Sequence, residues 1–126
     1  MAKLAVLRHE EGVRLNSDCL VALYSRLGEA GAELFMVQAL EELSVRLRDM
    51  QRFTDADDPE ELIRNARRLA LAADQIGMSS LARVARDVAQ AVGAGDVPGR
   101  AATIARMMRI ADRSLTAVWD MQDVIL

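Results

Sequence analysis

The feature that most constrains this chain is the regular spacing of its apolar residues. In two stretches they recur at alternating intervals of four and three positions: Met36, Leu40, Leu43, Leu47 and Met50, and then Leu62, Ala66, Leu69, Ala73 and Ile76. This spacing follows the 3.6-residue turn of an α-helix and gives each helix one apolar face. No segment alternates apolar and polar residues over the length of a strand. The pattern therefore predicts an all-α fold.

Capping and turn residues divide the chain into five predicted helices. The first begins near residue 17, with Asn16 or Ser17 as its N-cap, and ends at residues 28–31. The others cover about residues 32–53, 58–77, 79–93 and 98–119. Asp58 suits the N-cap of the third helix and Pro59 its first turn. In the fifth helix the residues predicted to face the core are Ile104, Met108, Ala111, Leu115 and Val118.

Helices two to five are long, amphipathic and joined by short connections. Short connections make sequential helices antiparallel neighbours. The sequence therefore predicts an antiparallel up-down-up-down four-helix bundle, a single domain over residues 16–126. Residues 1–15 form an extra N-terminal helix or arm in this interpretation.

Composition and charge exclude several classes of protein. The 126 residues carry a net charge of −3, which argues against a nucleic-acid partner because such binding needs clustered cations. No stretch approaches the roughly 20 apolar residues of a membrane span, and no signal peptide is recognisable, so we expect a cytoplasmic protein without a membrane partner. Cys19 is the single cysteine, which precludes an internal disulfide and suits a small buried side chain.

The residues that most enzymes need are missing from the sequence. With one histidine, His9, and one cysteine there is no zinc pattern and no Ser-His-acid set. The glycines near residue 95 are not followed by the lysine of a phosphate-binding loop, and no Glu-x-x-His pair is present. We therefore expect no metal, no cofactor and no enzymatic activity.

Three arginines in the third helix form the strongest candidate for a binding site. Arg64, Arg67 and Arg68 lie opposite the apolar stripe, and Leu71 lies on the same exposed side, one turn beyond Arg67. One interpretation is a solvated face in which Arg64 pairs with Glu60 at the i, i+4 spacing. The other is a surface that binds a partner.

The same region resembles the histidine-containing phosphotransfer (HPt) domain. The resemblance lies in residues 62–77, in the Ser79-Ser80-Leu81 that follows, and in the Gly95-Asp96 turn. The HPt motif runs approximately Ala-His-x-Leu-Lys-Gly, then small residues, a glycine and a leucine. Ala66, Leu69, Gly77 and Leu81 match this frame. The resemblance implies a four-helix bundle that acts in two-component signalling, where HPt domains relay phosphoryl groups between receiver domains.

The sequence departs from the motif at the positions that the family uses for phosphotransfer. Arg67 stands where the family has its phosphate-accepting histidine, Ala70 where it has lysine, and Leu71 where it has glycine. A guanidinium stays protonated and cannot accept a phosphoryl group. The resemblance thus implies a degenerate, non-transferring domain that binds and regulates a receiver domain or a histidine kinase. The partner-binding residues in this interpretation are Arg64, Arg67, Arg68, Ala70, Leu71 and Asp74.

A structural or assembly module is the alternative function. Such a bundle would self-associate into a homo-oligomer, or bind an unrelated protein, through an exposed apolar patch. Met107, Trp119 and Met121 are the candidates for that patch, since methionine-rich surfaces adapt to partners.

Overall fold

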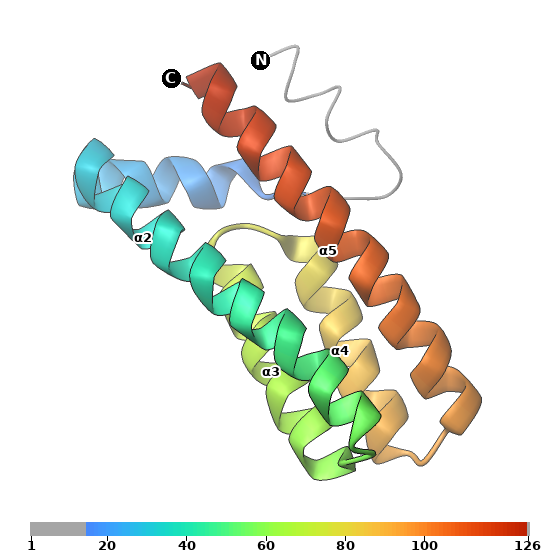
Figure 1. Ribbon diagram of the computed structural model, residues 1–126. Coiled ribbons are helices and arrows are strands. Elements are labelled where there is room, and N and C mark those ends of the chain that lie inside the picture. The colour runs from blue at the N-terminus through green and yellow to red at the C-terminus, as the bar shows by residue number, and fades with distance from the viewer. Residues whose placement is uncertain (1–14, 126) are drawn as a thin grey trace.

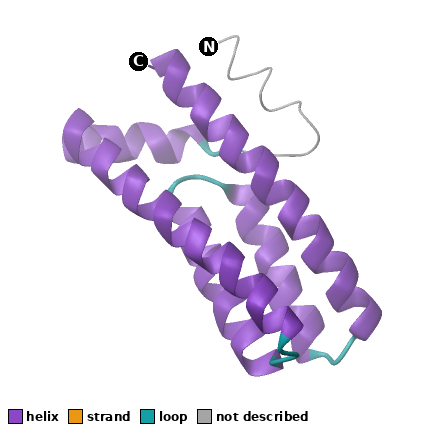
Figure 2. Ribbon diagram, in the orientation of Figure 1, coloured by secondary structure: helices purple, strands orange, loops and turns teal. Residues whose placement is uncertain are grey.

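Helices make up nearly all of the computed structural model, which describes residues 15–125, with side chains as far as Val118 (Figure 1). They are α2 (Ser17–Asp55), α3 (Pro59–Gln75), α4 (Ser79–Gly93) and α5 (Val97–Ile125). Within this range there is no strand (Figure 2), only an isolated β-bridge between Leu15 and Met78. The predicted all-α class is confirmed as a helical bundle. The predicted N-terminal arm, residues 1–15, lies outside the described residues except for Leu15.

α2 changes direction at Gly28, where the first predicted helix ends. Gly28 has φ 74° and ψ 173°, a backbone conformation that is essentially restricted to glycine. Residues 17–27, the blue end of α2, run in a different direction from the cyan and green remainder (Figure 1). The two predicted helices are therefore two segments of one element. The second segment starts directly after Gly28 rather than at Ala32.

Local hydrogen bonds explain where the helices begin. The side chains of the predicted caps Asn16 and Asp58 accept hydrogen bonds from the backbone N–H groups of Cys19, at 3.1 Å, and Glu61, at 3.2 Å. The backbone N–H of Asn16 also donates to the carbonyl oxygen of Gly77 at 2.7 Å. A Cβ on Gly77, which has φ 78°, would lie 2.8 Å from the Asn16 carbonyl oxygen. Glycine is thus required where the start of α2 meets the α3–α4 turn.

The helices pack in the order of the chain, α2 on α3, α3 on α4 and α4 on α5. The predicted apolar stripes supply the core, and its fully buried members include Leu43, Met50, Leu62, Leu69, Leu81 and Val88. α3 and α4 are each covered by neighbours on two sides, whereas α2 and α5 have one extensive helix contact each. No described helix is long and apolar enough to span a bilayer.

The predicted inward face of α5 is confirmed at Ala111 and Val118, which are buried, and is wrong at Met108. Met108 is 36% exposed, while Met107 and Ser114 are fully buried. Met107 and Met108 are adjacent, and either one is compatible with the helical spacing of Ile104 and Ala111. The buried side of α5 also includes Ser114, whose small side chain fits the core although its hydroxyl has no hydrogen-bond partner among the described residues.

Candidate functional site

The solvent-facing side of α3 carries most of the residues predicted to bind a partner. Its five exposed members are Arg64, Arg67, Arg68, Leu71 and Asp74, and the Leu71 side chain is prominent because the residue is 62% exposed. We call Arg64, Arg67, Arg68 and Leu71 the α3 arginine face. Helical periodicity places these side chains opposite the buried stripe, as the sequence predicted.

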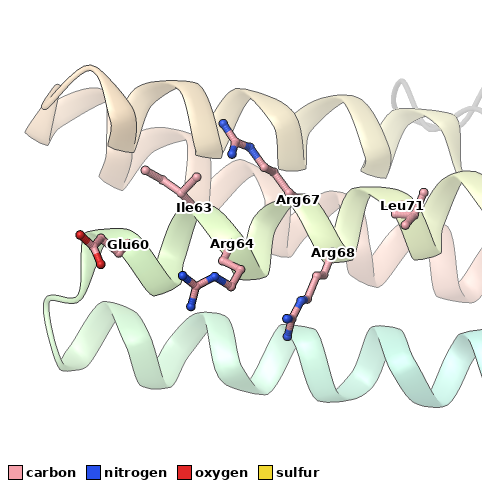
Figure 3. Close-up of a pocket in the computed structure, with 6 residues that line it drawn as sticks. All are labelled: Glu60, Ile63, Arg64, Arg67, Arg68 and Leu71. Carbon is pink, nitrogen blue, oxygen red and sulfur yellow. The ribbon is translucent and has the colours of Figure 1, made fainter.

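Ala70, which the sequence analysis placed among the partner-binding residues, does not belong to this surface. The residue is only 2% exposed. Because α3 packs against both α2 and α4, a wider part of its circumference is buried than a single stripe requires. Position 70 falls within that wider region. Leu71 therefore forms the exposed apolar part of the face, and the half-buried Ile63 lies about two turns earlier on α3, nearer Glu60 (Figure 3).

The charged groups on α3 differ in whether they have partners. Arg64 forms an ion pair with Glu61 at the i, i+3 spacing, rather than with Glu60 as predicted. Asp74 pairs with Arg86 of α4. Arg67 and Arg68 have no ion-pair partner among the residues whose side chains are described. Two exposed guanidinium groups thus remain available for an external anion or carboxylate.

A shallow, open hollow of about 470 Å³ lies along this face (Figure 3). Its lining residues are Glu60, Ile63, Arg64, Arg67, Arg68 and Leu71. Figure 3 shows the guanidinium group of Arg67 on the α4 side, those of Arg64 and Arg68 on the α2 side, and Leu71 toward the end opposite Glu60. The cations are spread along a shallow, partly apolar hollow. Such an arrangement suits contact with another protein better than the binding of one small ligand.

A polar contact beneath the face fixes α3 against α2, and sequence reasoning missed it. Asn65 is 2% exposed, and its Nδ2 donates to the carbonyl oxygen of Arg46 at 2.7 Å. Nη1 of Arg46 donates in return to Oδ1 of Asn65 at 3.2 Å. The Arg46 side chain also lies near Glu42 and Asp49, with Nε 3.2 Å from a Glu42 oxygen but not aligned for a hydrogen bond. The available signal was the position of Asn65, three residues after Leu62 and next to Ala66, on the side of α3 that faces the core.

The residues predicted for the assembly alternative do not form a described surface. Met107 is fully buried, so its predicted surface role is wrong. The side chains of Trp119 and Met121 lie outside the described part of the structure. The prominent exposed apolar side chains of α2 are instead Val21, Leu34 and Val37.

The geometry of the α3 arginine face supports recognition of anionic groups. Arginine presents a rigid fork of donors that matches a carboxylate or phosphate. The part of the chain with described side chains contains no His, Cys, Asp and Glu cluster able to hold a metal ion. Comparisons of the chain with known protein families, curated proteins and solved structures found no match. The α3 arginine face is therefore the structural feature from which a function can be proposed.

Proposed function

We propose that this chain is a non-catalytic signalling module that uses the α3 arginine face to bind an acidic surface of a receiver domain or a histidine kinase. In this proposal it is an HPt-like domain that occupies and regulates its partner without taking up phosphate. The proposal includes the antiparallel up-down-up-down arrangement of that family and a cytoplasmic location.

The proposal rests on the position of Arg67, on its exposure and on the lack of a charge partner among the described side chains. Arg67 occupies the motif position of the phosphate-accepting histidine, it is exposed in the middle of α3, and no described side chain neutralises it. A receiver domain presents an acidic pocket to its phosphotransfer partner. A fixed cation at position 67, supported by Arg68, is complementary to that pocket, and such complementarity accelerates association and selects partners.

Transfer of phosphate is not part of the proposal, for chemical reasons. The Arg67 guanidinium has no free lone pair to attack phosphorus at physiological pH. Position 70, where the family has a lysine that steadies phosphate charge, is a buried alanine. Leu71 replaces a glycine with an exposed bulky side chain, so the surface around position 67 differs in shape from that of a working relay.

The experiment combines binding and phosphotransfer measurements with receiver domains from the same organism. We expect binding that weakens as salt is added, and no phosphate on this chain after incubation with a phosphorylated receiver. Arg67→Glu should weaken binding at least about tenfold, because it places like charges together. The matched control is Arg109→Glu, since Arg109 is exposed on α5 and has no ion-pair partner among the described side chains.

Two results would count against the proposal. Unchanged binding of Arg67→Glu to every cognate receiver would remove the α3 arginine face from the interaction. Stable phosphate on this chain would show that another residue is the acceptor, with His9, outside the described residues, as the first to replace.

A further inference from the structure

The second segment of α2 exposes an apolar strip directly after the Gly28 break. Leu34 is 59% exposed and Val37 is 47% exposed. The two residues are three positions apart on one helix and therefore share a face. Glu33 and Glu41 lie four residues before and after Val37, so they flank the strip on the same side. We call Glu33, Leu34, Val37 and Glu41 the α2 glutamate face.

This part of α2 is strongly acidic. Residues 27–45 contain four glutamates and neither lysine nor arginine. Glu42 is 3.2 Å from Arg46, whereas Glu29, Glu33 and Glu41 have no ion-pair partner among the described side chains. The negative field is also felt by Tyr24, whose pKa is raised first by burial and then by the charges of Glu33 and Glu29. The α2 glutamate face thus combines exposed apolar side chains with uncompensated negative charge.

The α3 arginine face has the opposite character. Its exposed apolar residue is Leu71, at one end of the face, and its cations without an ion-pair partner among the described side chains are Arg67 and Arg68. One chain therefore carries two surfaces that each combine exposed aliphatic side chains with charge. The charge is negative on the α2 glutamate face and positive on the α3 arginine face. Matching potentials of this kind steer association and fix the register of a contact.

We infer that the partner of the α2 glutamate face is the α3 arginine face of a second copy of this chain. Reciprocal exchange, in which each α3 lies on the α2 of the other copy, gives a closed two-fold dimer, the commonest symmetry of self-associating proteins. The inference goes beyond the proposed signalling function, because the partner here is the chain itself. In such a dimer the α3 arginine face is occupied, so dimer formation and receiver binding compete.

Sedimentation velocity of the purified chain over a range of concentrations tests the inference without any receiver present. We expect a monomer–dimer equilibrium that shifts toward monomer as salt is added. The variants R67E/R68E and E33R/E41R should each weaken dimerisation at least about tenfold, because like charges then meet in both contacts. An equimolar mixture of the two variants should dimerise again, since opposite charges meet in both contacts of the mixed dimer.

The control is R83E/R109E, which reverses two exposed charges of α4 and α5 that have no described ion-pair partner. It changes net charge as much as R67E/R68E does and should dimerise like the parent chain. Far-UV circular dichroism confirms that every variant is folded. The inference is overturned if the parent chain stays monomeric at low salt, if the mixture stays monomeric, or if R83E/R109E dissociates as R67E/R68E does. Because no receiver is present, none of these results bears on receiver binding.

Discussion

At the scale of single residues, Tyr24 reports the charge of the surrounding part of α2. It is the only tyrosine in the chain, so its titration can be followed by tyrosinate absorbance. Burial, followed by the charges of Glu33 and Glu29, raises its pKa above the usual 10.0. We expect Glu33→Gln to lower this pKa while leaving it above 10.0, because burial is the larger cause.

The sign of the linked stability change follows from the direction of this shift. The fold favours the neutral phenol, so its contribution to stability is present below pH 10 and is lost as the pH rises through the raised pKa. In concentrated denaturant the pKa should return to about 10. A folded-state pKa at or below that of the denatured chain would contradict this account of the environment of Tyr24.

Asn65 tests whether the contact beneath the α3 arginine face holds α3 against α2. Asn65→Ala removes both hydrogen bonds to Arg46 and leaves a buried gap, so we expect a loss of about 2 kcal/mol in the free energy of unfolding. Arg68→Ala is the comparison, and it should change stability by less than about 0.5 kcal/mol because the Arg68 side chain is exposed and has no ion-pair partner among the described side chains. Urea denaturation measures both, and equal losses would show that the exposed face is structural.

The residues of α3 also show which features could be predicted from the sequence and which could not. The exposure of Arg67, Arg68 and Leu71 followed from helical periodicity, which depends only on local spacing. The burial of Ala70 did not, because alanine suits either environment and the second neighbouring helix could not be located. The partner of Asn65 lies 19 residues away on another helix, so no local pattern could have identified it.

At the scale of the elements, the break at Gly28 decides the course of α2. An L-residue is strained at φ 74° and ψ 173°, so Gly28→Ala should lower the free energy of unfolding by about 1–3 kcal/mol, although nothing lies within 4 Å of the added Cβ. Gly93→Ala is the matched control, because Gly93 is helical and its Cβ would meet Ile63 at an ordinary 3.8 Å. It should be neutral or stabilising by up to about 1 kcal/mol. Equal effects in urea denaturation would contradict a special role for Gly28.

Among the predicted helices, too, the features set by local interactions were predicted correctly and one that depends on a neighbouring helix was not. The caps Asn16 and Asp58 and the break at Gly28 could be read from neighbouring residues, since each acts on backbone groups within one turn. Which of the two adjacent methionines of α5 is buried could not be predicted in this way. Whether Met107 or Met108 faces the core depends on the surface that α4 presents to it.

At the scale of the whole molecule, the α3 arginine face takes part in both proposed interactions. The α3 arginine face meets an acidic receiver in the proposed function and the α2 glutamate face of a second copy in the inferred dimer. Both contacts need Arg67 and Arg68, whereas the α2 glutamate face serves the dimer alone. E33R/E41R therefore separates the two, because it should weaken dimerisation at least about tenfold while leaving the α3 arginine face intact for a receiver.

The sequential packing of the helices also predicts an order of local stability. α3 lies between α2 and α4, and α4 between α3 and α5, so these two inner helices lose most of their contacts only when the whole bundle opens. The outer helices α2 and α5 each have one extensive helix contact and can open with less loss of buried surface. Hydrogen exchange at concentrations where the chain is monomeric should therefore be slowest in Leu62–Ala73 and Leu81–Val92. It should be faster in residues 17–27, which lie beyond the Gly28 break, and in α5. Exchange in α5 as slow as in α4 would show that α5 is held by contacts beyond those with α4, and that the bundle opens as a single unit.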